Sequence, residues 1–302
     1  MTRKLFYALM LILSQSTLFA QSKEELDLYR KNFDAILYSP ITEAQKIEKF
    51  KTDIPDVFFK QKGFYTLTKA MEFRSIGLLE FLFTVKGVPV NGDADYTHEN
   101  IFAYLPYDNY SVVKPGTCTQ LDTSLSIRKE LITYLIKKGA PLNHIDANGN
   151  NVMITAMYKK DLETLKFLYE MNNKKFIDAP GNNLLYYGSY IGCLDFTKWL
   201  VEQGMDVNIP NKYEGSAIGA AVNHPEIVKY LIEKGANVNL ANGYGWTPIM
   251  YAANYGNMES VKLLVEAGAD LTLKNSKGWD VLYVAKEYKR KEVLKYLKSV
   301  SK

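Results

Sequence analysis

Residues Gly245–Asp270 read GWTPIMYAANYGNMESVKLLVEAGAD, and this stretch decides the fold. Thr247 and Pro248 form a helix start, because a hydroxyl residue favours the cap position and proline fits the first turn. Gly256 breaks this helix, and a second helix with one apolar face follows it and ends at Gly268. Neither short helix can bury its apolar face alone, so the pair has to stack against similar units.

The stretch resembles an ankyrin repeat, because it matches the family's G-x-T-P-L-H-x-A-A-x-x-G and V-x-x-L-L-x-x-G-A-D runs. It departs from those runs at Ile249 and Met250, and it has Val-Lys-Leu-Leu from Val261 where the family has V-x-x-L-L. The resemblance implies an all-α solenoid of stacked helix-turn-helix units with β-hairpin-like loops. It also implies a binding scaffold without catalysis.

The Gly-Ala-x-x-Asn ends of the units set a period. Gly235 lies 33 residues before Gly268, and Trp246 lies 33 residues before Trp279. Among helical arrays this is the ankyrin period. Working outward, it divides residues 58–302 into about seven repeats. They are 58–91, 92–143, 144–178, 179–208, 209–239, 240–272 and 273–302, of which the last ends in a Lys-rich helix suited to a C-terminal cap.

Two segments fall outside the regular period. Residues 21–57 are predicted to form an N-terminal helical cap, because apolar residues from Leu26 to Leu37 lie on one helical face. The second repeat is lengthened by an insertion at 106–123. Long loops in compact arrays are either functional or without structure of their own, and both interpretations stay open here.

Residues 1–20 have a short basic start, nine apolar residues at Leu5–Leu13 and a polar segment that ends at Ala20. This pattern predicts a secretory signal peptide, since the apolar run is too short to span a bilayer. We therefore expect an exported bacterial protein, periplasmic or secreted, with no membrane association once the signal is removed. The alternative is an uncleaved membrane anchor, and a mature N-terminus at Gln21 would exclude it.

Composition is ordinary for a globular protein and provides for a sizeable core. The chain has 302 residues, of which 47% are hydrophobic and 23% are charged. Its formal net charge is only +4, which indicates neither a nucleic-acid partner nor an acidic substrate.

No residue pattern in this sequence predicts a catalytic, metal-binding or phosphate-binding site. The histidines, His98, His144 and His224, do not share ligand spacing on one helix, so no metal site is expected. The serines lie in no G-x-S-x-G or S-x-x-K pattern, and the glycines fall at repeat boundaries rather than in a phosphate-binding loop. We expect a non-enzyme without a cofactor. The alternative is an enzyme whose site lies in the insertion.

The two cysteines, Cys118 and Cys193, are too few for a disulfide scaffold, although export would permit a bridge. Two repeat steps separate them, about 20 Å if helices stack about 10 Å apart. A disulfide needs Cα atoms within about 7 Å. Two separate thiols are therefore expected, unless the insertion folds along the stack.

The resemblance implies that a partner docks on the concave side, on hairpin tips and first helices. Carrying the register of Gly245–Asp270 to the other repeats predicts an exposed aromatic stripe there. The stripe consists of Tyr158, Tyr190, Tyr213, Tyr244, Trp246, Tyr255, Trp279 and Tyr288. Aromatic residues dominate protein interfaces, so we expect another protein as partner and a monomeric chain.

Two alternatives to this interpretation stay open. The aromatic residues of the stripe can instead stack between neighbouring hairpins, since tyrosine is abundant throughout this chain, with 22 residues. The protein can also have the narrower role of a periplasmic inhibitor or immunity protein that blocks a toxin or an enzyme.

Overall fold

The computed structural model describes residues 23–54, 58, 63–86, 88, 105, 125–145, 150–176, 183–211, 213 and 215–301. The predicted signal peptide at 1–20 and the insertion at 106–123 lie outside this part of the chain. Every regular element within it is a helix, so the prediction of an all-α repeat solenoid is confirmed. The chain divides into two compact units, Met1–Pro106 with Glu130–Ala140 and Tyr107–Lys129 with Pro141–Lys302.

The first unit is held together by an aromatic core. The rings of Phe33 and Phe50 stack at a centroid distance of 4.6 Å, and Phe50 lies 6.4 Å from Phe81. All three side chains are buried. Phe33 lies in α2 (Lys23–Leu37), Phe50 in α3 (Glu43–Asp53) and Phe81 in the short π-helix η1 (Phe81–Val85). This unit also contains α5 (Gly63–Glu72) and α6 (Ile76–Glu80).

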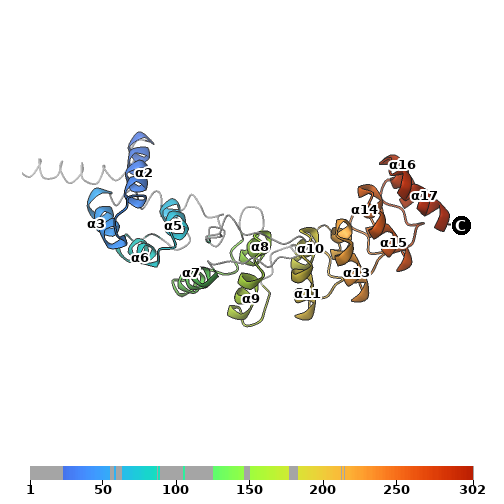
Figure 1. Ribbon diagram of the computed structural model, residues 1–302, viewed down its shortest axis with the longest axis horizontal. Helices are drawn as coiled ribbons and strands as arrows, with labels where there is room; N and C mark the ends of the chain where they lie inside the picture. The colour runs from blue at the N-terminus through green and yellow to red at the C-terminus, as the bar shows by residue number, and fades with distance from the viewer. Residues whose placement is uncertain are drawn as a thin grey trace, which may run out of the picture. The chain divides into compact units, whose positions relative to one another are not determined.

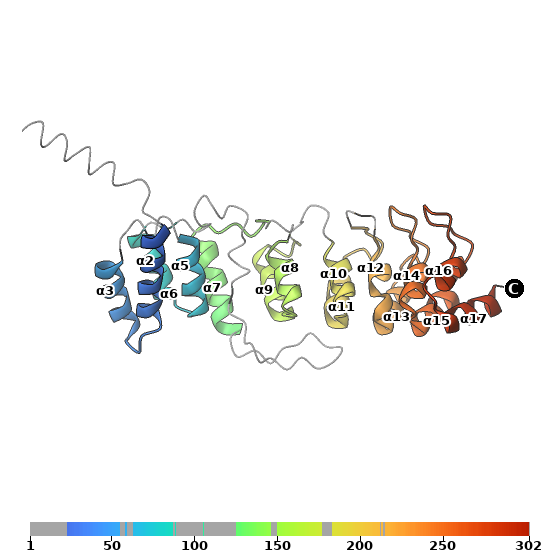
Figure 2. The same ribbon diagram turned by 90° about the horizontal axis from the view of Figure 1, so that it is seen from above.

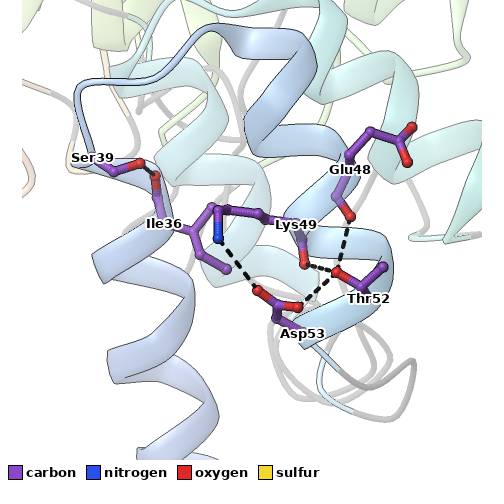
Figure 3. Close-up of polar contacts among 6 residues, drawn as sticks. All are labelled: Ile36, Ser39, Glu48, Lys49, Thr52 and Asp53. Carbon is purple, nitrogen blue, oxygen red and sulfur yellow. Dashed lines mark hydrogen bonds and ion pairs between the residues drawn. The ribbon is translucent and has the colours of Figure 1, made fainter.

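Side chains cap the start of α3 and contact one another at its end. At its start the backbone N–H of Gln45 donates to Thr42 Oγ1, and the N–H of Thr42 donates to Gln45 Oε1, which forms a capping box. At its end the Thr52 hydroxyl lies 2.6 Å from Asp53 Oδ1, and Lys49 Nζ lies 3.9 Å from the second oxygen of that carboxylate (Figure 3).

The second unit is a regular stack of helix pairs. The first helices of its repeats contact one another in sequence, and so do the second helices, which gives two parallel rows of helices (Figures 1 and 2). The first helices are α8 (Val152–Tyr158), α10 (Leu184–Tyr190), α12 (Ala217–Ala220), continued by the 3-10 turn η4 (Ala221–Asn223), α14 (Pro248–Tyr255) and α16 (Val281–Glu287). The second helices are α9 (Leu162–Met171), α11 (Leu194–Glu202), α13 (Pro225–Glu233), α15 (Met258–Glu266) and α17 (Lys291–Val300). The helix α7 (Leu125–Lys137) is divided between the units, because its residues from Glu130 onward belong to the first unit.

Asparagines at the ends of the repeats tie successive units together. Asn208 Oδ1 accepts from the backbone N–H of Asn237, and its amide donates to the carbonyl of Gly235. One repeat later, Asn239 makes the same two bonds to Asp270 and Gly268. These contacts explain why the Gly-Ala-x-x-Asn ends recur with the period of the array.

The start of α14 departs from the expected capping. Thr247 has the extended backbone of a cap residue and Pro248 occupies the first turn, but the Thr247 hydroxyl is buried and accepts no cap hydrogen bond. The backbone carbonyl of Thr247 accepts from Met250 N and Tyr251 N instead, at 3.0 and 3.2 Å. The predicted helix start is therefore confirmed, with Thr247 as the cap residue and Pro248 in the first turn, although the Thr247 hydroxyl makes no cap hydrogen bond.

Cys193 also corrects an expectation. It lies at the cap position of α11, its side chain is 1% exposed, and it is disulfide-bonded. The expectation of two separate thiols is therefore wrong. Cys118, the only other cysteine in the sequence, lies outside the described residues. The distance of about 20 Å applies to a regular stack of repeats, and the disulfide at Cys193 agrees with the alternative that was left open for the insertion.

Candidate functional site

Three successive hairpin tips in the described part of the array are each built around one asparagine. Asn242 Oδ1 accepts from the backbone N–H groups of Tyr244 and Trp246, both at 2.9 Å, and this fixes the tip between them. Asn211 and Asn275 do the same in the hairpins before and after it. Backbone bonds then join neighbouring tips. These are Gly243 N to Tyr213 O at 3.3 Å and Ser276 N to Tyr244 O at 2.9 Å.

The six tyrosines of the predicted stripe are exposed, with side-chain exposures between 41% for Tyr288 and 64% for Tyr244. Tyr158, Tyr190 and Tyr255 are each the last residue of a first helix, in α8, α10 and α14. Tyr288 follows α16 directly, and Tyr213 and Tyr244 lie in the hairpins. The structure thus places these tyrosines at two recurring positions of the repeat, the tip of the hairpin and the end of the first helix.

The two tryptophans of the stripe are less exposed than its tyrosines. Both are half-buried. Trp246 lies 5.3 Å from the ring of Tyr251 and 6.4 Å from that of Tyr288, and Trp279 lies 4.8 Å from Tyr283. These rings pack within and between repeats, so the tryptophans have the stacking contacts of the alternative interpretation.

A groove is lined by residues of the first helices of three successive repeats, α10, α12 with η4, and α14. These helices follow one another along the row of first helices (Figure 2). The walls of the groove are two tyrosine pairs, Tyr186 with Tyr190 from α10 and Tyr251 with Tyr255 from α14. Small residues of the middle repeat leave the space between the pairs open. We call this site the tyrosine groove, and its remaining lining residues are Gly215, Ser216, Gly219, Ala220 and Asn223.

The size of the groove limits what it can hold. It encloses about 90 Å³, well below the roughly 300–1,000 Å³ of pockets that surround a drug-sized ligand. The groove therefore has room for a side chain of a partner that lies across it, rather than for a complete small molecule.

Two of the groove phenols, those of Tyr186 and Tyr251, have a raised pKa. Burial raises the pKa of Tyr186, and the neighbouring phenols Tyr187, Tyr190 and Tyr255 raise it further, against the opposing effect of a hydrogen bond with Asn211. Burial likewise raises the pKa of Tyr251, with contributions from Tyr186 and Tyr255. The Tyr251 hydroxyl accepts from Asn242 Nδ2 at 2.6 Å, so the asparagine that shapes the hairpin also positions a groove tyrosine.

Sequence reasoning found Tyr190 and Tyr255 but missed Tyr186 and Tyr251. A signal for both was present, because each lies four residues before a stripe tyrosine in the same helix, and residues at i and i+4 share a face. What the spacing could not show is that the repeat between them carries only small residues at the facing positions.

The part of the chain that the structure describes contains no group of three or more His, Cys, Asp or Glu residues placed to hold a metal ion. Of the histidines within it, His224 precedes α13, and its imidazole covers Gly192, where an added Cβ would come within 2.3 Å of His224 Cε1. Among the same described residues, no helix combines the length and the apolar character needed to cross a membrane.

Comparison with known families gives a clear result. The family described as ankyrin repeats (3 copies) matches residues 124–211 and 216–301, which together are more than half of the chain. The chain belongs to the ankyrin-repeat family. Members of this family are typically non-catalytic, and their repeats generally serve as protein–protein interaction modules. No curated protein matches the sequence.

Proposed function

We propose that this chain is an exported, non-catalytic protein that binds a partner protein on its aromatic stripe. The observation that carries the proposal is the placement of six exposed tyrosines at hairpin tips and first-helix ends of one array. Tyrosine offers a large contact area at low entropic cost, which favours it at interfaces. Hydrogen bonds between neighbouring tips hold this surface in a preformed shape, which reduces the entropy lost on docking.

Export is proposed on two grounds. Residues 1–20 have the pattern of a signal peptide, and Cys193 is disulfide-bonded, as is usual outside the reducing cytosol. The proposed location is the periplasm or the extracellular space. The chain is proposed to be monomeric and without a cofactor, and nucleic acid is not among its proposed partners.

A narrower role as an inhibitor or immunity protein stays an alternative. An aromatic docking surface suits it, but no described contact selects a toxin or an enzyme as the partner.

Removing two exposed tyrosines should abolish binding. We expect Tyr244→Ala with Tyr255→Ala to lose capture of the partner, because both side chains lie on the stripe and are more than half exposed. Stability should change little, by about 0.5 kcal/mol or less for each exposed site. Affinity purification from the exported fraction followed by mass spectrometry measures capture, and thermal unfolding measures stability.

The matched control is Tyr38→Ala. Tyr38 is 61% exposed, but it follows α2 in the first unit and is not part of the stripe. It should leave both capture and melting temperature nearly unchanged. A Tyr244→Ala/Tyr255→Ala variant that melts earlier and still captures the partner would show that these tyrosines serve packing instead.

Export has its own test. N-terminal sequencing of the protein from the periplasmic or culture fraction should give a chain that begins at Gln21. Digestion of the same protein without reduction should give one disulfide-linked peptide that contains both Cys118 and Cys193. Alkylation of thiols in denaturant, without prior reduction, should label neither cysteine. A chain that keeps residues 1–20 and stays in the membrane fraction would contradict export by cleavage and support the anchor alternative.

A further inference from the structure

We propose that the last helix of the array, α17, binds an acidic surface of the partner protein through one row of lysines. The row consists of Lys291, Lys295 and Lys298, and we call it the basic face. This proposal rests on the proposed function, and it specifies the chemistry that the partner brings to the C-terminal end of the stripe. It is carried by the charge of the last repeat and by the difference between α17 and the earlier second helices.

Positive charge is concentrated in the last repeat. Residues 273–302 contain nine lysine and arginine residues and only three aspartate and glutamate residues, which gives a formal charge of +6. Since the whole chain has a formal net charge of +4, residues 1–272 together have −2. The balance of the whole chain therefore hides a strongly basic end, and this end attracts an acidic partner to one place on the protein.

The basic face lies on the exposed side of α17, the last helix of the array (Figure 1). Its three lysines are all exposed. They are spaced by four and three residues, so they share one side of the helix and span about 10 Å along it. Another side of α17 buries Val293 and Leu297, and the helix packs against α15 and α16. What α17 presents to solvent is therefore a row of like charges.

The earlier second helices balance their lysines, whereas α17 does not. In α9, α11, α13 and α15 a recurring lysine has one acidic residue three positions before it and another four positions after it, and both positions are its neighbours on the helix surface. At Lys295, α17 has the first acidic residue, Glu292, but Ser299 takes the place of the second. The balanced groups are Glu163, Lys166 and Glu170; Asp195, Lys198 and Glu202; Glu226, Lys229 and Glu233; and Glu259, Lys262 and Glu266.

Capping explains the polarity of the basic face but not the sign of its charge. A capping repeat needs a polar outer face, and Lys291 and Lys298 replace residues that are apolar in the four earlier second helices. Glutamate, glutamine or serine would meet this need as well. Three lysines at this spacing also repel one another, which costs helix stability. The replaced apolar residues are Leu162, Leu194, Pro225 and Met258 at the position of Lys291, and Tyr169, Val201, Ile232 and Val265 at that of Lys298.

The charges of the basic face are not neutralised within the part of the chain that the structure describes. No ion pair joins them to a carboxylate there, whereas Lys166 Nζ lies 2.9 Å from Glu163 Oε1 in α9. The neighbouring Arg290 is already engaged, since its Nε donates to the carbonyl of Asn254 at 2.8 Å. The basic face thus keeps three ammonium groups that can pair with carboxylates of a partner.

The position of the basic face favours a protein as its partner. The stripe residue Tyr288 lies three residues before Lys291, so a protein that covers this end of the stripe meets the start of α17. An anionic membrane is another acidic surface, but an interfacial helix binds it by burying an apolar face in the lipid. In α17 that face is already in use, because Val293 and Leu297 are buried in the array.

The test uses the purified full chain and two synthetic peptides of equal length, with glutamate or glutamine at four alternating positions of a Gly-Ser backbone. Isothermal titration calorimetry measures affinity, and amide NMR locates the site. At about 50 mM salt we expect the glutamate peptide to bind at least about fivefold more tightly than the glutamine peptide. At about 300 mM salt this difference should fall below about twofold, because exposed charges are screened.

Neutralising the basic face should remove this preference. Lys291→Gln with Lys295→Gln and Lys298→Gln removes three charges and keeps good helix formers in α17. We expect it to weaken binding of the glutamate peptide at least about fivefold at the lower salt concentration. Far-UV circular dichroism confirms that the variant is folded.

The matched control makes the same change in net charge on the earlier repeats. It is the triple variant Lys198→Gln, Lys229→Gln and Lys262→Gln, in which each lysine is exposed and lies between two acidic residues of its own helix. We expect its affinity for the glutamate peptide to stay within about twofold of the wild type. An equal loss in both triple variants would show a general effect of net charge and would overturn the proposal.

Two further outcomes would overturn it. One is equal affinity for the glutamate and glutamine peptides. The other is tighter binding of phosphatidylglycerol vesicles or of oligothymidylate than of the glutamate peptide, lost on neutralising the basic face, which would assign this face to lipid or to nucleic acid.

Failure of this proposal is distinguishable from failure of the proposed function. If Tyr244→Ala with Tyr255→Ala abolishes capture while the glutamate peptide does not bind, the stripe docks a partner that has no acidic surface at this end. If that double variant still captures the partner, the proposed function itself fails.

Discussion

The Arg128→Met variant is expected to lose about 3–5 kcal/mol of unfolding free energy, the usual effect of breaking a buried ion pair. Arg128 has no exposed surface, and it is the largest fully buried side chain among the described residues. Its Nη2 lies 2.8 Å from Asp161 Oδ2 in ion-pair rather than hydrogen-bond geometry, and its Nε donates to Thr164 Oγ1 at 3.0 Å. Removing the guanidinium leaves the Asp161 carboxylate buried without its countercharge.

Asp161 has a second role, and this role determines which substitution of Asp161 can be used in the control variant. Its other carboxylate oxygen accepts from Thr164 N at 2.9 Å and caps α9. Asp161→Asn keeps this cap, because asparagine caps a helix about as well as aspartate, but it removes the charge. Arg128→Met with Asp161→Asn removes both charges together, so we expect it to recover more than half of the loss.

Urea unfolding measures these differences, followed by circular dichroism and by tryptophan fluorescence because long repeat arrays can unfold in steps. A loss below about 1 kcal/mol in Arg128→Met would show that the pair contributes little. A double variant as unstable as the sum of the single variants would show that the two side chains act independently.

Gly245→Ala is expected to destabilise the array clearly more than Gly268→Ala. Both glycines have left-handed backbone, with φ of 73° and 88°. An added Cβ at Gly268 meets nothing within 4 Å, whereas at Gly245 it would lie 2.9 Å from the Cα of Asn275 in the next hairpin. Gly268→Ala should therefore cost only the left-handed penalty, about 1–2 kcal/mol.

Gly245→Ala should add about 1–3 kcal/mol of steric strain. The contact is with backbone, and the Ser276 N to Tyr244 O bond holds that backbone in place. Relaxing the clash therefore separates neighbouring hairpin tips. The urea midpoints of the two variants and the wild type check this prediction. Equal midpoints for the two variants would show that the hairpins adapt without loss.

The fold could be predicted because its signals are local. Gly256 and Gly268 lie where α14 and α15 end, both with left-handed backbone. Val261 and Leu264 are fully buried on one helical face, as their spacing predicts. These features depend on residues a few positions apart, so they can be read from the chain directly.

The candidate site could be predicted only in part. The register placed six tyrosines that the structure shows to be exposed, but it could not separate them from Trp246 and Trp279, which are half-buried. The tyrosine groove was not predicted, because it needs Tyr186 and Tyr251 on either side of a repeat with small residues.

The residue pattern is enough to predict the repeat period, the helix pairs and the glycines that end them, because helical periodicity and left-handed backbone are properties of short segments. The packing of the repeats settles which side chains meet about one repeat apart. It buried Arg128 against Asp161, placed a disulfide at Cys193 and opened the groove between two tyrosine pairs. The physical reason is that burial and charge pairing depend on the facing repeat, which the local pattern of either repeat does not specify.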